Sequence, residues 1–374
     1  MSLLNVVIVG GGLAGLTSAL HLTQSGLGVT LIEKNPYPRH KVCGEYISNE
    51  VLPYLDYLGV DPFKFGAKKI DNFELSAVQG KSVFAELPLG GFSISRFQLD
   101  HLLYKKAVKN GVTVIQDSVT DIDFTDNRFQ IRLKNHPLLE AVFVIGAYGK
   151  RSNLDQKMGR KFLKSKAPYL AVKAHYKGDY PENLVGLHHF YGGYCGVSNV
   201  ENNNLNVCYI AEYAQFKKYK NIKEFEEKVL FKNKKLKSIF KHSSLLFDKP
   251  LSISQISFAS KPLIEDHVIM SGDSAGMIHP LCGNGMSMAI NSAKMISELL
   301  IQYFDGSIDR AMVEQKYVAK WEEEFKLRIQ TGKLLSRVFR MKRLTLFSLN
   351  LLKNYPKLIK YIIRMTHGKP TIAV

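Results

Sequence analysis

One stretch of the chain combines residue types that a folding core rarely needs. It reads GDSAGMIHPLCGNGMSMAI, from Gly272 to Ile290, and it places a carboxylate before small residues, a proline and a Gly-Asn-Gly. Glycine and proline weaken regular structure, and a buried Asp is costly without a partner. The pattern predicts a backbone that is brought close to a ligand, followed by an apolar helix.

A second glycine motif opens the chain. The apolar run Val6–Val9 is typical of a short buried strand, and Gly10-x-Gly12-x-x-Gly15 follows it directly. A helical stretch comes next, and Glu33 stands at the tip of the following strand. In this arrangement the glycines allow a pyrophosphate to approach the helix N-terminus, and the acid accepts the ribose hydroxyls. The motif predicts a dinucleotide, either NAD or FAD.

Composition narrows the class of protein. The chain has 374 residues, enough for two or more lobes, and its four cysteines are too scattered for a disulfide framework or a zinc site. This cysteine usage favours a cytoplasmic location. The histidines lack the i, i+4 pairing with acids that is typical of metal sites, so we expect no metal, and no GxSxG elbow of a hydrolase occurs.

The apolar N-terminus resembles a secretion signal or a membrane span. Residues Leu3 to Leu22 are largely apolar, but they contain four glycines and no basic region precedes them. No other stretch reaches the uninterrupted apolar length of a membrane-spanning helix. We therefore expect a soluble chain.

Positive charge is concentrated at the C-terminus. The formal net charge is +18, and no acidic residue follows Glu324. The basic residues after it are Lys326, Arg328, Lys333, Arg337, Arg340, Lys342, Arg343, Lys353, Lys357, Lys360, Arg364 and Lys369. Apolar residues alternate with them at helical spacing, which predicts a pair of amphipathic helices broken at Pro356. Two interpretations stay open: contact with the inner face of a membrane, or a helical cap whose outer face is basic. Nucleic-acid binding is not expected, because no binding module accompanies the charge.

The two glycine motifs, together with SRFQLDHLL and VIGAYGKRSN, resemble a large flavoprotein superfamily. It includes the para-hydroxybenzoate-hydroxylase-like monooxygenases and the geranylgeranyl reductases, and the chain is most similar to the reductase branch. The resemblance runs from Val6 to about Leu300. It implies an α/β fold with a Rossmann-like FAD-binding domain, an antiparallel-sheet substrate domain and a helical C-terminus. We assign residues 1–72, 93–168 and 249–305 to the FAD-binding domain, 73–92 and 169–248 to the substrate domain, and 306–374 to the basic helical region.

The resemblance also implies which residues hold FAD. Asp273 should hydrogen-bond the ribityl chain, and Arg96 should approach the phosphate and ribityl region. The backbone from Pro280 to Gly285 should lie against the isoalloxazine, with the next helix directing its N-terminus at the flavin, where it stabilises negative charge by about 0.3–1 kcal/mol. The full expected set is Gly10, Gly12, Leu13, Ala14, Gly15, Glu33, Lys34, Arg96, Asp273, Pro280, Gly283, Asn284, Gly285 and Met286.

Three residues are candidates for catalysis. KVCGEYIS resembles the Cys-Gly-Glu segment of geranylgeranyl reductases and some flavin-dependent halogenases. Cys43 is then a redox-active or gating thiol, or a small buried residue beside a glycine turn. Glu45 is a candidate proton donor, and His279 either relays a proton near the flavin or has a structural role. The expected substrate wall, or alternatively the aromatic packing of a twisted sheet, comprises Tyr191, Tyr194 and Cys195, with His188 and His189 beside them.

Departures from the family patterns leave the reaction open. Tyr148 occupies the position of an Asp that hydroxylases usually carry, which argues against a simple NADPH-docking hydroxylase. Trp321 is the single tryptophan, so the Trp-x-Trp motif of tryptophan-type halogenases is absent. We expect an FAD-dependent oxidoreductase, with NAD(P)H or another donor, that reduces C=C bonds of a polyprenyl or lipid-like substrate. The alternatives are a monooxygenase acting on an aromatic or polyketide-like compound, and a non-redox FAD-binding or interaction protein.

Overall fold

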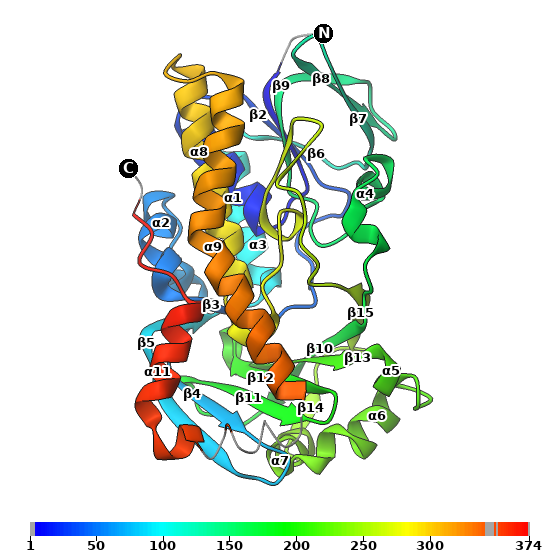
Figure 1. Cartoon of the computed structure of the whole chain (residues 1–374), viewed down its shortest axis with the longest axis vertical. Helices are drawn as coiled ribbons and strands as arrows, with labels where there is room; N and C mark the ends of the chain where they lie inside the picture. The colour runs from blue at the N-terminus through cyan, green and yellow to red at the C-terminus, as the bar shows by residue number, and fades with distance from the viewer. Residues whose placement is uncertain (1–3, 341–347, 349–350, 373–374) are drawn as a thin grey trace.

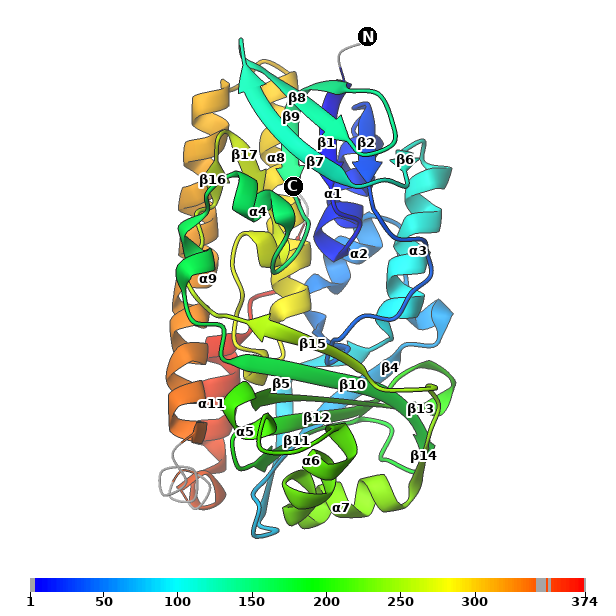
Figure 2. The same cartoon turned by 90° about the vertical axis from the view of Figure 1, so that its right-hand side faces the viewer.

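The computed structural model describes residues 4–340, 348 and 351–372. It consists of two sheets stacked along the long axis of the molecule, with helices on their outer sides (Figure 1, Figure 2). The helices are α1 (Leu13–Gln24), α2 (Leu52–Tyr57), α3 (Arg96–Lys109), α4 (Asn153–Lys157), α5 (Tyr213–Phe216), α6 (Ile222–Lys228), α7 (Lys234–Lys241), α8 (Gly285–Phe304), α9 (Arg310–Arg340) and α11 (Pro356–Thr366).

The first sheet has the doubly wound form that the opening glycine motif predicts. Its strand order is β16 (Ile264–Glu265), β17 (Val268–Met270), β9 (Leu139–Gly146), β1 (Leu4–Val9), β2 (Val29–Ile32) and β6 (Thr113–Ile115), with the hairpin β7 (Val119–Thr125) and β8 (Arg128–Leu133) joined to β9. The strands from β17 to β6 run parallel, so their carboxyl ends share one edge. Gly10, Glu33, Ala147 and Ser271 follow four of these strands at that edge.

The second sheet forms the lower half of the molecule in Figure 2. Its strand order is β14 (Ser243–Leu245), β10 (Tyr169–Gly178), β13 (Asn204–Glu212), β12 (Gly193–Asn199), β11 (Leu184–Phe190), β4 (Lys68–Ser76), β5 (Ser82–Ser93) and β3 (Tyr46–Ser48), and β15 (Leu251–Ile256) also pairs with β10. The pairing is antiparallel, as expected, except between β4 and β11, which run parallel.

The strand pairing moves two of the expected domain boundaries. β3, the first residues of β4 and β15 all belong to the second sheet, although they lie in segments assigned to FAD binding. The reason is that the chain crosses between the sheets at these points, and hydrogen-bond pairing is not visible in a one-dimensional pattern. Helix α3 begins at Arg96, capped by the side chain of Ser95, and the turn Asp126–Asn127 joins β7 to β8.

Each sheet has its own core. Helices α1 and α8 pack on the first sheet, and α5, α6 and α7 cover one face of the second. The opposite face of the second sheet is turned toward the first sheet and the C-terminal helices. Helix α9 runs along both halves, and α11 packs against β5 and α9 (Figure 1). Of the expected amphipathic pair, residues 341–347 and 349–350 lie outside the described residues. Among the described helices, none is both long enough and apolar enough to cross a membrane.

Candidate cofactor and substrate site

A cavity of about 840 Å³ lies between the two sheets. Such a volume is typical of sites for cofactors and small molecules, which measure roughly 300–1,000 Å³. Residues from the carboxyl edge of the first sheet, from the inward face of the second sheet and from α9 and α11 line it. The expected cofactor residues among them are Gly10, Gly12, Leu13, Ala14, Glu33, Lys34, Arg96, Asp273, Pro280, Gly283, Gly285 and Met286.

Close backbone packing explains the glycines of the opening motif. Gly10 has a φ of +108°, which side-chain-bearing residues rarely adopt, and a Cβ there would overlap the carbonyl of Ala147. A Cβ on Gly15 would overlap the carbonyl of Gly10, so Gly15 brings α1 close to the strand without lining the cavity itself. Gly12 caps α1 without a side-chain hydrogen bond. The backbone N–H groups of the first helical turn therefore face the cavity as an anion site.

Glu33 is held in place by charge and by backbone donors. Its Oε2 accepts the N–H of Gly11 at 2.9 Å, and its Oε1 lies 2.9 Å from the guanidinium of Arg39 and accepts the N–H of Asn35 at 3.0 Å. Burial alone would raise the pKa of Glu33, but Arg39 and these N–H groups outweigh it and lower the pKa. Glu33 is therefore an ionised hydrogen-bond acceptor at the mouth of the glycine loop.

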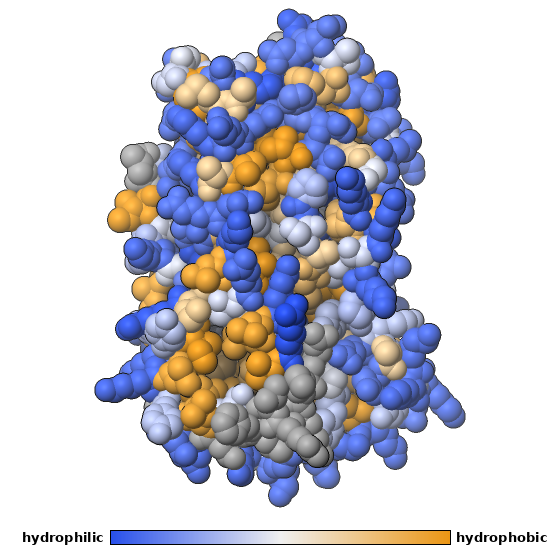
Figure 3. Space-filling model, in the orientation of Figure 1, coloured by the Kyte–Doolittle hydropathy of each residue, from blue (hydrophilic) through white to orange (hydrophobic). Residues whose placement is uncertain are grey.

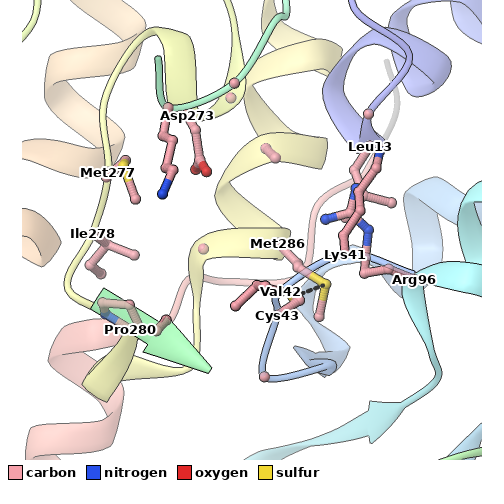
Figure 4. A pocket seen from close by; sticks show the side chains of 18 of the residues that line it. Leu13, Lys41, Val42, Cys43, Arg96, Asp273, Met277, Ile278, Pro280 and Met286 are labelled. Atoms are coloured by element: carbon pink, nitrogen blue, oxygen red, sulfur yellow. Dashed lines mark hydrogen bonds between the residues drawn. The ribbon is translucent and has the colours of Figure 1, made fainter. Parts of the chain in front are cut away.

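Asp273 lies on the opposite side of the cavity from Arg96 and Lys41 (Figure 4). Within the described residues, no protein group donates a hydrogen bond to its carboxylate. Burial raises the pKa of Asp273, and the positive charges of Lys261, Arg96 and Lys150 offset only part of that rise. A half-buried carboxylate at the cavity wall without a protein donor fits a ligand that brings its own hydroxyl groups.

Arg96 and Lys41 are joined through one buried acid. Arg96 donates two hydrogen bonds to Asp100, at 2.7 and 2.9 Å, and Lys41 donates a third at 2.7 Å. The two cations share one anion, which leaves a net positive charge beside the glycine loop. This surplus suits a negatively charged group such as a pyrophosphate.

Glu45 belongs to a buried charge cluster that the sequence pattern did not reveal. Its carboxylate accepts hydrogen bonds from Lys173 at 2.7 Å and from the backbone N–H of Arg96 at 2.8 Å, and His175 Nε2 lies 2.7 Å from it. Burial opposes ionisation of Glu45, but Lys173 and His175 outweigh it and lower its pKa. Glu45 is thus a carboxylate, and the prediction that it donates a proton does not fit this arrangement. Lys173 and His175 are two residues apart on β10, so their side chains lie on the same face of the sheet. This spacing is the sequence signal that could have grouped them in one site.

Cys43 contacts the start of α8. Its Sγ lies 3.5 Å from Sδ of Met286, and both side chains line the cavity (Figure 4). Burial raises the pKa of the Cys43 thiol, with Glu45 adding to the rise and Arg96 opposing it. Asn206 from β13 donates to the carbonyl of Gly44 at 2.9 Å and so ties this loop to the second sheet. Cys43 is therefore a neutral thiol held in a fixed loop.

His279 lies outside the main cavity. It lines a much smaller cavity with Tyr169 and Tyr194, and its ring packs against Phe258 at a centroid distance of 4.5 Å. Its Nδ1 accepts the backbone N–H of Leu281 at 3.4 Å. The structure therefore favours the structural role for His279 over a proton relay beside the cofactor.

Of the three residues of the expected substrate wall, one lines the main cavity. Tyr194 lines the main cavity, whereas the next residue on β12, Cys195, points into the core beneath α6 and α7, because successive strand side chains face opposite sides. Tyr191 lies at the turn after β11, in contact with His189, and lines neither cavity. His188 is buried against Ser76 at 2.9 Å.

Asn284 lies just before α8 and belongs to a hydrogen-bond network outside the cavity. Its amide donates to Glu50 at 2.9 Å, and Glu50 also accepts the backbone N–H of Gly368 and lies 3.5 Å from Arg328. Burial raises the pKa of Glu50, and Arg328 only partly offsets it. The network connects the start of α8 to the C-terminal segment, so Asn284 positions the helix without lining the cavity.

The far end of the cavity is apolar. We name this end the apolar chamber; Phe73, Leu75, Leu187, Leu335, Phe339, Leu352, Ile359, Ile362 and Ile363 line it. The first three residues come from the second sheet, and the others come from α9, the segment before α11, and α11 itself. The sequence predicts amphipathic C-terminal helices, but it does not indicate which surface their apolar faces cover, so this wall was missed.

The residues present fit FAD. The glycine loop leaves room for a backbone-bound pyrophosphate, Glu33 and Asp273 offer acceptors for hydroxyl groups, and the surplus positive charge at Arg96 matches an anion. Gly283 has a φ of +63° just before α8, which brings the backbone of that loop against the cavity. In the ranges that the structure describes, no group of His, Cys, Asp and Glu residues could hold a metal ion.

Comparisons with known proteins agree with this fit. A family model described as "FAD binding domain" matches residues 4–320. A digeranylgeranylglycerophospholipid reductase 2 from Methanothermobacter thermautotrophicus is 23% identical over 357 residues, covering 91% of this chain and 87% of that protein. A tryptophan 2-halogenase from Chondromyces crocatus is 24% identical over 345 residues, covering 86% of this chain and 65% of its own length.

A solved structure shares the architecture over nearly the whole chain. The flavoprotein/dehydrogenase from Cytophaga hutchinsonii superimposes with a TM-score of 0.82 at 21% identity, covering 98% of this chain and 92% of that one. Likeness at this level of identity shows the fold. Since the family model spans most of the chain, the protein belongs to the FAD-binding domain family and is an FAD-dependent oxidoreductase.

Proposed function

We propose that the protein reduces C=C bonds of a long hydrophobic, lipid-like substrate with electrons from FAD. One observation carries the proposal: the cavity that begins at the glycine motifs continues into the apolar chamber. A polar end suits the cofactor, and an apolar end removes hydrocarbon from water at roughly 25 cal/mol per Å² buried. A polyprenyl chain is the substrate class that such a chamber fits best.

The chain's own residues divide the work of holding FAD. The N–H groups at the start of α1 would bind the pyrophosphate, with Arg96 nearby, and Glu33 would accept the ribose hydroxyls. Asp273 would accept hydroxyl groups of the ribityl chain, and the N-terminus of α8 would stabilise negative charge on the flavin. When bound and reduced, FAD supplies a hydride.

Cys43 is placed to supply the proton that must accompany a hydride. Saturating a C=C bond adds a hydride to one carbon and a proton to the other, so the protein needs a protonated group at the cavity wall. Cys43 keeps its proton at neutral pH, because burial raises its pKa, and Glu45 cannot serve because Lys173 keeps it ionised. Water can reprotonate the resulting thiolate after product leaves.

The test is reoxidation of the reduced protein without oxygen. The purified holoprotein is reduced anaerobically with dithionite, and its flavin absorbance is followed after adding an unsaturated polyprenyl lipid. Recovery of the oxidised spectrum, with the saturated lipid as product, is the expected result. Recovery only after air is admitted, with oxygen inserted into an added compound, would establish a monooxygenase instead. A flavin that neither NAD(P)H, dithionite nor a ferredoxin-like donor reduces would indicate a non-redox role.

The role of Cys43 has a matched control on the same protein. We expect Cys43→Ala to slow lipid reduction about 100-fold, since general acids contribute at least that much, while the flavin spectrum stays unchanged. Cys195→Ala should leave the rate within about twofold, because Cys195 faces the core on the other side of the sheet. Equal rates for the two variants would exclude Cys43 as the proton donor.

A further inference from the structure

The two faces of α11 differ sharply in chemistry. On the inner face, Ile359, Ile362 and Ile363 line the apolar chamber. On the outer face, Lys357 and Arg364 are exposed, and 61% of the Tyr361 surface is accessible to solvent. The spacing of three and four residues along the helix keeps each set on its own side. Helix α11 is therefore both a wall of the chamber and part of the molecular surface.

The chain before and after α11 extends the same surface. Leu351 and Tyr355 are 38% and 63% exposed, and Lys353 and Lys369 are exposed beside them. An apolar side chain and two tyrosines thus stand among basic residues. Tyrosine suits the boundary between water and hydrocarbon, because its ring is apolar and its hydroxyl is polar.

The positive charge of this surface is largely uncompensated. No acidic residue follows Glu324 in the sequence. Lys360 pairs with Glu86 of β5 at 2.9 Å, whereas Lys353, Lys357 and Arg364 form no ion pair in the described parts of the chain. The surface consequently presents basic groups that are available to an anionic partner.

The apolar chamber opens beside these residues. In Figure 3, hydrophobic residues gather around a hollow at the place where α9 and α11 lie side by side in Figure 1. The lining of the cavity includes residues of both helices, among them Leu335 and Ile362. An opening rimmed by apolar side chains exposes hydrocarbon surface to water unless something covers it.

We propose that α11 and the residues next to it dock on an anionic lipid surface, so that the chamber opens toward the bilayer. Lys353, Lys357 and Arg364 would meet the phosphate groups of an anionic leaflet. Tyr355 and Tyr361 would lie at the level of the headgroups. An acidic protein would also match the positive charge of this surface. A bilayer is favoured because its hydrocarbon would in addition cover the apolar opening of the chamber. The substrate class rests on the proposed function, whereas the docking itself does not.

The test measures vesicle binding by flotation, without substrate. The holoprotein is mixed with vesicles of phosphatidylcholine alone or of phosphatidylcholine with phosphatidylglycerol. We expect binding to the anionic vesicles only, weakening as salt is raised, because screening shortens the range of exposed charges. Equal binding to both vesicles, or binding to neither, would overturn the proposal; capture of an acidic polypeptide in place of vesicles would identify a protein partner.

Two basic segments of the same protein, α7 and the region of α11 with the residues just before it, provide matched variants. Lys353→Glu, Lys357→Glu and Arg364→Glu together should weaken binding to anionic vesicles at least 100-fold, which is three interactions of about 1 kcal/mol each. The same charge change on α7, with Lys234→Glu, Lys237→Glu and Lys241→Glu, should cost less than fivefold, since those exposed lysines are not beside the opening. Equal losses would show that only net charge matters. Unchanged flavin absorbance and thermal unfolding verify that both variants fold.

A second variant separates docking from the charge alone. Tyr361→Ser keeps every positive charge but removes an exposed ring, and we expect binding to fall three- to tenfold. Lipid reduction in detergent should be unchanged in this variant. For the wild-type protein, vesicle binding without any lipid reduction would refute the proposed function and leave the docking proposal intact. Lipid reduction without vesicle binding would refute the docking proposal and leave the proposed function intact.

Discussion

The cavity is lined by two carboxylates, the buried Glu45 and the half-buried Asp273, that differ in their hydrogen-bond partners. The Nζ of Lys173, the Nε2 of His175 and the backbone N–H of Arg96 all lie within 2.8 Å of the carboxylate oxygens of Glu45. Asp273 receives no hydrogen bond to its carboxylate from the part of the chain that the structure describes. Burial raises the pKa of Asp273, whereas the partners of Glu45 overcome burial and lower its pKa.

The difference separates a structural charge from a binding charge. A buried acid whose partners are all supplied by the protein fixes the chain around it, and here Glu45 holds the loop of Cys43 against the second sheet. Asp273 is only partly shielded from water and has no such partner among the described residues, so its carboxylate gains a hydrogen bond when a ligand donates to it. Proximity to a cavity alone would have assigned both residues the same role.

The largest effect should come from breaking the Glu45 pair. Lys173→Met leaves Glu45 buried with one strong partner fewer, and both side chains are inaccessible to solvent. We expect the free energy of unfolding to fall by about 3–5 kcal/mol, as for other buried ion pairs that lose one member. Chemical denaturation of the holoprotein measures it.

A double variant checks the cause of that loss. Adding Glu45→Gln to Lys173→Met removes the uncompensated charge, so a large part of the lost stability should return. A double variant as unstable as the single one would show that packing around Lys173, and not charge, was responsible.

A smaller effect, and on a different quantity, is expected at Asp273. Asp273→Asn should weaken FAD binding to the apoprotein about 10- to 100-fold, since hydrogen bonds to a charged group are worth about 1.5–3 kcal/mol. The free energy of unfolding of the apoprotein should not fall, because the variant removes a half-buried carboxylate that has no protein donor in the described ranges. Fluorescence titration with FAD and denaturation of the apoprotein give the two values. Unchanged affinity would remove Asp273 from the cofactor site.

The smallest effect lies in the pH dependence of stability, and its sign differs between the two acids. The folded-state pKa of Glu45 is below its usual 4.5, so its stabilisation is complete above that pH and is lost as the pH falls further. The folded-state pKa of Asp273 is above its usual 3.8, so its contribution is complete below that pH and is lost as the pH rises.

Denaturation of the apoproteins over a pH series tests these signs. The advantage of the wild type over the Glu45→Gln, Lys173→Met double variant should shrink as the pH falls below 4.5. The advantage of Asp273→Asn over the wild type should grow as the pH rises above 3.8. Each changes by at most about 1.4 kcal/mol per pH unit. Parallel curves for all three proteins would contradict both assignments.

Local chemistry allowed much of the cofactor end to be predicted. Gly10 and Gly15 are required because the backbone packs too closely for a side chain, and such a requirement is written into a few neighbouring residues. The order of strand, glycine turn, helix, strand and acid in the sequence predicts β1, α1, β2 and the position of Glu33 at the end of β2. Twelve of the fourteen expected cofactor residues line the cavity, while Gly15 and Asn284 support it from behind.

The surroundings of the three catalytic candidates could not be predicted, because they depend on partners far away in the chain. Glu45 meets Lys173 and His175 about 130 residues later, and no local pattern announces that pairing. His279 lies within the second glycine motif, yet the fold directs its side chain toward a separate small cavity. Strand alternation separates Tyr194 from Cys195, but the register that decides which one faces the cavity comes from pairing with β13.

The sequence by itself determined the dinucleotide motif, the glycine-rich loop before α8 and the excess of positive charge at the C-terminus, since each depends on residue types within a short stretch. Only the tertiary structure decided which acid at the cavity is paired, which strands belong to which sheet and that α11 closes an apolar chamber. Those outcomes depend on long-range contacts, in which the environment of a side chain is set by segments that lie far away in the sequence.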